Sequence, residues 1–230
     1  MKSPLIILLL LMSSLGFAQT EVFEKTLAYG NQIIAIDAEL VDEIKVSNWT
    51  KDQIAFKVTY SVNQGELNDL VQLDLNESSN RVKLKVDFDQ ERIEVSGIYV
   101  CDDERSLNWN TGGRKSSVCL DIQIELMVPK NTKLDIESVI GDLYIEGVYQ
   151  ELYAKTVTGD IEVNWPETEG AELEIKTVSG GIYTNHDFKM RQEKGLPLIS
   201  AHEVQGNIGE AGRYLNLETV TSNIYFKRTK

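Results

Sequence analysis

Histidine and cysteine are scarce in this chain, whose 230 residues include only two of each. With His186 and His202 as the only imidazoles, no Ser-His-Asp or Cys-His grouping for nucleophilic catalysis can be argued. The sequence also lacks a phosphate-binding glycine loop of the P-loop or dinucleotide type. These absences weigh against the enzyme classes that depend on such groups, so we expect a non-enzymatic protein with no cofactor and no metal site.

Long apolar runs are also lacking, and no stretch after the first residues could form a transmembrane helix. A short apolar run at 5–12 follows Lys2 and precedes small residues that end at Ala18. This is the pattern of a secretory signal peptide, so we expect residues 1–18 to be removed and the mature chain to begin at Gln19. No cysteine follows the run, which argues against a lipoprotein anchor. The sequence therefore predicts an exported protein that is periplasmic, attached to the cell surface or secreted.

Basic residues are outnumbered, with 23 Lys and Arg against 36 Asp and Glu and a formal net charge of -13. Such a charge repels phosphate backbones and anionic lipid head groups, which argues against nucleic acid and against electrostatic docking to a membrane. The partner that we expect is a protein or a glycan. The sequence does not determine the oligomeric state.

Cys101 and Cys119 lie 18 residues apart, each in a run of alternating apolar residues. Export to an oxidising compartment predicts a disulfide that ties together the two arms of a long hairpin. The alternative, a metal pair or a redox dithiol, lacks the Cys-x-x-Cys spacing and a nearby histidine.

A short phrase recurs five times in the second half of the chain. Each copy has alternating apolar residues on both sides of a small turn, which indicates two short strands joined by a corner. Copies at a period of 16 to 26 residues predict a parallel β-solenoid, in which equivalent strands of successive coils pair. The copies read L-D-I-E-S-V-I-G-D-L-Y-I from Leu134, L-Y-A-K-T-V-T-G-D-I-E-V from Leu152, L-E-I-K-T-V-S-G-G-I-Y-T from Leu173, I-S-A-H-E-V-Q-G-N-I-G from Ile199 and L-N-L-E-T-V-T-S-N-I-Y-F from Leu215.

The corners use residues that tolerate positive φ or whose side chains bind a nearby backbone amide. Asp142 and Asp160 could also be interpreted as a calcium ladder or a catalytic carboxylate pair. The dense Gly-and-Asp repeat of calcium-binding β-rolls is absent, and Gly181 stands where a third acid would be needed, so a stack of turn residues is favoured. The predicted corner residues are Gly141, Asp142, Gly159, Asp160, Gly180, Gly181, Gly206, Asn207, Ser222 and Asn223.

The repeat register predicts two columns of interior side chains, one before and one after the corners. The first column is Val139, Val157, Val178, Val204 and Val220; the second is Leu143, Ile161, Ile182, Ile208 and Ile224.

Residues 19–129 alternate apolar and polar residues with the period of two that strands require, but without the regular phrase. This part is either a set of early coils or a β-rich cap over the open end of the array. We place the boundary at Pro129, so that the solenoid repeats occupy 130–230. Helical periodicity is nearly absent, and its one short candidate is 66–75.

Two segments interrupt the strands and are candidate contact surfaces. The polar loop between the cysteines carries Trp109 and Arg114, and an exposed tryptophan suits stacking on a sugar or anchoring a protein. Alternatively, Trp109 folds back and packs on the sheet. The segment 185–197 lengthens the third copy and contains His186 and Phe188.

The phrase V-x-G-D-[IL]-x-[VI], preceded by an apolar-x-apolar-x-[ST] strand, resembles that of the bacterial putative-adhesin family of exported β-solenoid domains of unknown function. The resemblance covers residues 134–226, and I-K-V-S-N-W-T-K-D-Q-I-A-F-K-V upstream is similar to the opening strands of such proteins. It implies a non-enzymatic cell-envelope or secreted protein that presents loops to a partner, and it brings no catalytic residues.

Two other functions stay open at this point. One is a carbohydrate-active enzyme on a β-helix, which an acid-lined groove with aromatic walls would favour, whereas flat Lys-Glu-Thr faces would favour binding or structure. The other is a periplasmic sensor or regulatory partner of a membrane protein.

Overall fold

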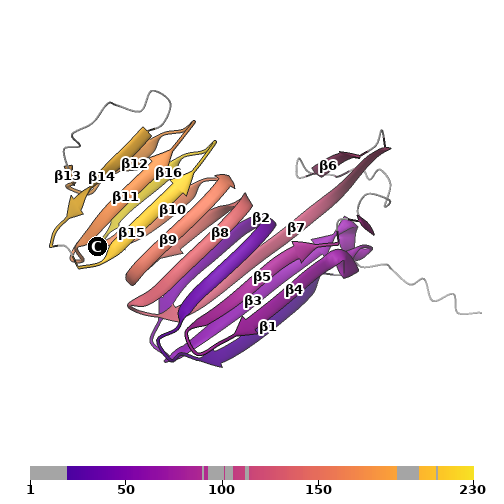
Figure 1. The fold of residues 1–230 in the computed structure, drawn as a ribbon, viewed down its shortest axis with the longest axis horizontal. Coiled ribbons are helices and arrows are strands. Elements are labelled where there is room, and N and C mark those ends of the chain that lie inside the picture. The colour runs from indigo at the N-terminus through magenta and orange to yellow at the C-terminus, as the bar shows by residue number, and fades with distance from the viewer. Residues whose placement is uncertain are drawn as a thin grey trace, which may run out of the picture.

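The computed structural model describes residues 20–89, 91–92, 101, 106–111, 114–190, 202–210 and 212–230. The predicted signal peptide lies outside these residues. The described part is all-β, with sixteen strands in one large sheet of mixed parallel and antiparallel pairing (Figure 1). Where a short helix was predicted at 66–75, the chain instead forms a single 3-10 turn at Asn68–Leu70 and then enters a strand at Val71. No described helix has the length and apolar character needed to cross a membrane.

The strands have the following bounds in chain order. They are β1 (Glu21–Ala28), β2 (Ile33–Trp49), β3 (Gln53–Val62), β4 (Val71–Glu77), β5 (Arg81–Phe88), β6 (Ser106–Thr111), β7 (Arg114–Pro129), β8 (Thr132–Glu146), β9 (Tyr149–Thr158), β10 (Ile161–Pro166), β11 (Ala171–Thr177), β12 (Ile182–Thr184), β13 (Lys189–Met190), β14 (His202–Ile208), β15 (Tyr214–Thr219) and β16 (Ile224–Thr229).

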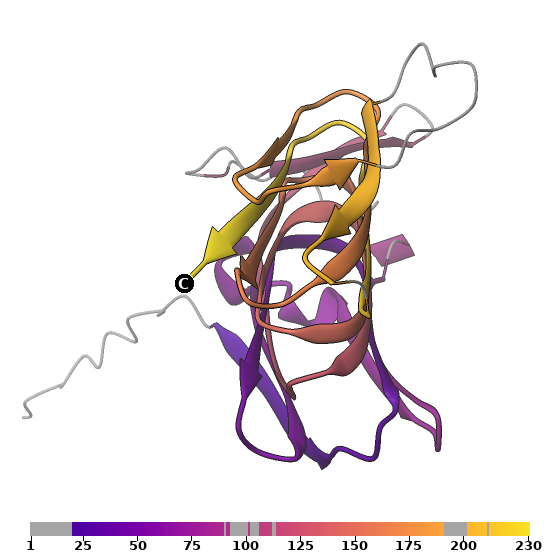
Figure 2. The same cartoon turned by 90° about the vertical axis from the view of Figure 1, so that its left-hand side faces the viewer.

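The sheet turns back on itself, because β2 and β8 are long strands that belong to two faces. Their first parts pair with each other and lie between β5 and β9, and their second parts lie between β7 and β10. The register between them shifts at Leu40 and Glu43, where the chain bends. What we call the front face therefore runs β4-β5-β2-β8-β9-β15-β11-β14-β13, and the back face runs β1-β3-β7-β2-β8-β10-β16-β12. Figure 2 shows the two faces as opposing walls.

The core fills the space between the faces. Side chains alternate between buried and outward positions along β10 and β11, as a strand with one dry face requires. The largest fully buried side chains include Trp165, Phe56 and Phe226. The same sheet continues across the predicted boundary at Pro129, since β2 pairs directly with β8; the division into two regions stays a prediction.

The predicted stacking of successive coils is wrong for the last two copies. The fifth copy, β15 and β16, lies between the second and the third, so that Leu215 pairs in parallel with Leu152 on one side and with Leu173 on the other. The fourth copy, β14, runs antiparallel to β11. A simple parallel solenoid is thus not what the pairing shows.

The fourth copy also forms no corner. Gly206 and Asn207 lie inside β14, and Gly206 pairs with Leu173. The reason is visible in the sequence: the phrase continues as I-G-E-A-G-R, which supplies no second apolar strand.

The first predicted interior column is also wrong. Val139, Val157 and Val178 are 46%, 37% and 43% exposed, whereas the Ser or Thr before each of them is buried. Successive strand residues point to opposite faces, so a register error of one residue turns the whole column outward. The second column is confirmed for Leu143, Ile161 and Ile224, which are buried and in register with the half-buried Ile182. Ile208 is buried but lies outside this column, because it pairs with Ala171 on the front face.

Candidate binding surfaces

The corners of four copies are joined by a ladder of Asx side chains. Asp142 Oδ1 accepts a hydrogen bond from the Asp160 backbone N–H at 2.8 Å, and Asp160 Oδ1 accepts one from Asn223 N–H at 2.8 Å. Asn223 Oδ1 accepts the next, from Gly181 N–H at 2.9 Å. Each side chain thereby satisfies an amide at a turn, where the strand ladder cannot. We call this chain of hydrogen bonds the Asx ladder.

A second ladder of hydroxyl groups lies just inside the corners. Thr156 donates to Gly141 O at 3.2 Å, and Thr219 donates to Gly159 O at 3.1 Å. Both threonines are fully buried. Backbone packing is equally close here, because a Cβ at Gly159 would lie 2.1 Å from Gly141 O. Ser222, which stands in the place of a glycine, accepts a hydrogen bond from Gly159 N–H at 3.1 Å.

An acid-lined groove of about 400 Å³ opens beside the first corner, where β2, β7 and β8 meet. Its lining residues are Asp42, Glu43, Gln123, Asp142 and Tyr144. The sequence analysis did not identify it, because Asp42 and Gln123 lie outside the repeated phrase. Asp142 was the only signal that could have indicated it.

The carboxylates of the groove are held by partners within the fold. Asp42 accepts a hydrogen bond from Ile122 N–H at 2.6 Å, Glu43 accepts one from Lys45 Nζ at 2.6 Å, and Asp142 belongs to the Asx ladder. Burial, together with the negative charge of Asp142 and Glu43, raises the pKa of the Tyr144 phenol. In the described part of the chain, no three His, Cys, Asp or Glu side chains are placed to hold a metal ion.

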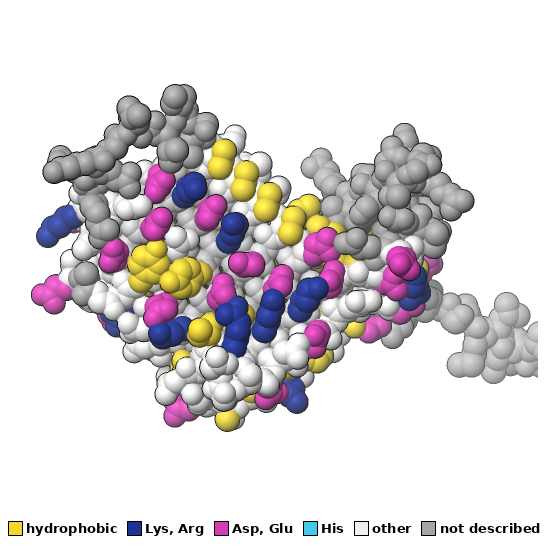
Figure 3. All heavy atoms as spheres, in the orientation of Figure 1, with side chains coloured by type: hydrophobic (Ala, Val, Ile, Leu, Met, Phe, Trp, Pro, Cys, Tyr) yellow, Lys and Arg dark blue, Asp and Glu magenta, His cyan; other side chains and the backbone are white. Residues whose placement is uncertain are grey.

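The front face is a broad lattice of charged side chains. Ion pairs join neighbouring strands, such as Lys83 with Asp37 at 2.6 Å and Lys155 with Glu218 at 3.9 Å. Figure 3 shows this mixture of acidic and basic side chains over the front face, together with two bulky apolar groups. An aromatic pair also lies on this face, formed by the exposed Tyr153 and the half-buried Tyr214, whose ring centroids are 5.7 Å apart.

His186 and Phe188 lie against the end of the core. The His186 ring centroid is 4.9 Å from that of Phe226, and its Nε2 is buried without a hydrogen-bond partner. Burial lowers the pKa of His186. Phe188 is half-buried and packs against the hydrophobic core. Their use as a contact surface remains a prediction.

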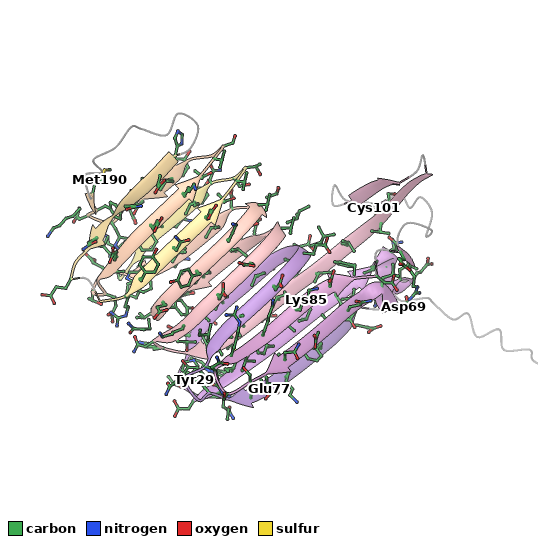
Figure 4. All side chains as sticks on the ribbon, in the orientation of Figure 1. Tyr29, Asp69, Glu77, Lys85, Cys101 and Met190 are labelled. Atoms are coloured by element: carbon green, nitrogen blue, oxygen red, sulfur yellow. A yellow bond between two sulfur atoms is a disulfide. The ribbon has the colours of Figure 1, made fainter. Side chains whose placement is uncertain are left out.

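Trp109 and Arg114 lie on the β6–β7 hairpin, where Trp109 pairs with Ser116 and Arg114 with Thr111. Their side chains are outside the described part of the structure. The hairpin and the 185–190 segment are at opposite ends of the molecule, as the labels of Cys101 and Met190 show in Figure 4, so the candidate contact residues do not form one site.

The predicted disulfide between Cys101 and Cys119 is confirmed. Cys119 belongs to β7, and its backbone N–H donates to Asn63 Oδ1 at 2.7 Å. The disulfide therefore attaches the start of the hairpin region to a strand that reaches into the main sheet.

No known protein family matches the sequence, and no curated protein matches it. Among solved structures, a putative cell adhesion protein from Clostridium sporogenes is similar over 92% of this chain and 100% of its own, with a TM-score of 0.55 and 10% identity. The chain has the fold of a bacterial adhesin-like protein. This confirms at the level of fold the resemblance that the repeated phrase carries.

Two further putative adhesins, from Bacteroides fragilis and Parabacteroides merdae, cover 91% and 92% of this chain at 11% and 9% identity. The chain in turn covers 97% of each of them. Their TM-scores are 0.29 and 0.25.

Proposed function

We propose that the chain is an exported, non-enzymatic, adhesin-like protein whose solenoid-like stack presents its outer faces to a protein or glycan, or serves as a structural part of the cell envelope. The observation that carries the proposal is the use of polar side chains. At the corners and in the groove they hold the fold together, and on the front face they form a flat lattice of charges. Such an arrangement offers surface and shape and leaves no free pair of groups for catalysis within the groove.

Export is supported by two independent features. Residues 1–18 have the pattern of a signal peptide, and the disulfide between Cys101 and Cys119 suits an oxidising compartment. The fold shared with a protein described as involved in cell adhesion agrees with this placement.

Fractionation of the native host tests the export step. We expect to find the protein outside the cytoplasm, with the mass of a chain that begins at Gln19. Both cysteines should resist alkylation until a reductant is added. A cytoplasmic protein that retains residues 1–18 would refute the proposal.

A carbohydrate-active enzyme is the second candidate, and the acid-lined groove beside Tyr144 is the observation that favours it. We expect no hydrolysis when the protein is assayed on a panel of polysaccharides. The control is Asp74→Asn, which changes an exposed carboxylate on β4. If hydrolysis is found, and if Asp42→Asn abolishes it while Asp74→Asn leaves it unchanged, the protein is an enzyme instead.

A further inference from the structure

The valines that were predicted to be interior form an exposed apolar ridge along one edge of the front face. Figure 3 shows a row of apolar side chains along that edge. The ridge consists of Val139, Val157, Val220 and Val178 on the adjacent strands β8, β9, β15 and β11, or directly after them. Val220 is half-buried, and the other three are 37% to 46% exposed. Four apolar side chains in register, without a partner among the described residues, indicate a contact surface.

A row of charges runs parallel to the ridge, two residues earlier on each strand. Its members alternate in sign across the four strands, from Glu137 through Lys155 and Glu218 to Lys176. Because side chains two residues apart share a face, the row and the ridge point to the same side of the sheet.

The alternation makes this surface complementary to itself. When a second copy is turned by a two-fold axis that lies in the interface, parallel to the strands and between β9 and β15, the order of the strands is reversed. Glu137 then faces Lys176 of the second copy. Lys155, whose Nζ lies 3.9 Å from Glu218 of its own copy, also faces Glu218 of the second copy, and each contact occurs twice. Along the ridge, valine meets valine at all four positions.

We propose that this surface, the four valines and the four charges, is a docking site for a second copy of the chain. The inference does not depend on the proposed function. At the rim, Asp37 and Glu203 would face each other, but Asp37 is already paired with Lys83 at 2.6 Å. The charges therefore fix the orientation of the dimer, and the valines supply the apolar contact.

The size of the surface sets the strength of the dimer. Strands about 4.8 Å apart and rows about 6.8 Å apart give a patch well below the roughly 800 Å² per partner of a standard interface. The dimer is accordingly weak and depends on protein concentration. A dimer would carry two copies of any binding surface, so it could contact a partner at two places where a single chain contacts it at one.

Sedimentation velocity of the purified protein at increasing concentration is the first test. We expect the mass to rise from one copy towards two. A monomer at every concentration up to about 100 µM would overturn the proposal.

Charge reversal tests the geometry. Lys155→Glu places two acids opposite each other at two positions, and Glu218→Lys does the same with two bases. Each variant should therefore raise the dissociation constant of the dimer at least tenfold, which corresponds to a loss of about 1.4 kcal/mol of binding free energy. The double variant restores opposite charges and should restore the dimer. Single variants that dimerise like the parent, or a double variant that stays monomeric while its melting temperature is unchanged, would refute this orientation.

The ridge is tested by Val157→Lys, with Val22→Lys as a matched control. Val22 is 54% exposed and lies on β1, at the far end of the back face. Val157→Lys should abolish the dimer, and Val22→Lys should leave it intact. A dimer that survives Val157→Lys uses another surface, which would contradict the proposal.

Discussion

At the scale of single residues, the same acidic side chain can be interpreted as a functional group or as a structural one, and its hydrogen-bond partners distinguish the two roles. Asp142 and Asp160 each use a carboxylate oxygen to accept a backbone N–H from the next corner. Asn223 takes the same role with its amide oxygen, which shows that the position needs an acceptor and not a negative charge. This supports the interpretation of the corner acids as turn residues.

Asp160 provides the residue-scale prediction. Asp160→Ala leaves the Asn223 N–H without its acceptor, so we expect it to lower the free energy of unfolding by about 1 to 3 kcal/mol. Asp160→Asn retains an acceptor oxygen and should cost less than half as much. Urea denaturation measures both variants. Equal losses for the two variants would show that the negative charge matters. The same conclusion would follow if calcium stabilised the parent protein but not the Asp160→Asn variant.

His186 gives a pH-dependent prediction. Its pKa is lowered in the fold mainly by burial, and backbone groups of Lys227 and Trp165 oppose this shift. As pH falls through about 6.5, the unfolded chain takes up a proton that the folded chain does not, so stability is lost on acidification in this window.

Replacing His186 with Phe keeps a ring against Phe226 and removes the titrating group. Melting temperatures between about pH 7.5 and 5.5 should therefore fall less for His186→Phe than for the parent. His202→Gln, at an exposed position on β14, is the comparison that shows whether the other histidine contributes. If all three proteins show the same pH dependence, His186 does not cause it.

How far the sequence predicts single positions depends on local geometry. The column after the corners was correct for the four copies that form a corner, because the residues after the turn keep strict alternation. The column before them was not, since a buried Ser or Thr is needed to bind the corner carbonyl and forces the larger valine outward. Sequence hydrophobicity alone favours valine over threonine as the core residue, so it could not reveal this exchange.

At the scale of elements, the β6–β7 hairpin depends on its disulfide. Replacing Cys101 and Cys119 with Ser opens a loop whose ends are 18 residues apart, and we expect a loss of up to about 3 kcal/mol in unfolding free energy. Urea denaturation with and without a reductant measures it. If a reductant lowers the stability of the parent to that of the double variant, the disulfide stabilises the hairpin. If the reductant has no effect on the parent, this role of the disulfide is contradicted.

The elements themselves were largely predictable, and their order was not. Alternating residues on both sides of a small corner identify the strands of the first three copies and of the fifth. Which strand neighbours which is decided by long-range packing. Nothing local distinguishes Leu215 as the partner of both Leu152 and Leu173. The groove was missed for the same reason, because it joins residues from three strands that are distant in sequence.

At the scale of the whole molecule, the C-terminal copy is a central element. β15 pairs with β9 and β11, and β16 pairs with β10 and β12, so the last residues of the chain complete the middle of both faces. In a simple stack, the last copy would be an end that could be removed at little cost.

Removal of residues 214–230 should therefore prevent folding beyond the second copy. We expect the truncated chain to lose cooperative thermal unfolding by circular dichroism, since β9 and β11 both lose β15, the strand that joins them. Removal of β1 by deletion of residues 1–28 is the matched comparison, because β1 pairs only with β3 at the edge of the sheet. If the C-terminal truncation unfolds as cooperatively as the N-terminal one, the inserted arrangement is wrong.

Exposure of the protein on intact cells is the decisive test of an adhesin-like role. Cells of the native host are treated with a protease and probed with an antibody against the mature chain, with a cytoplasmic protein as the control for lysis. We expect the protein to be digested or released from intact cells while the control is protected. A chain that stays protected until the cells are opened would contradict an adhesin-like role.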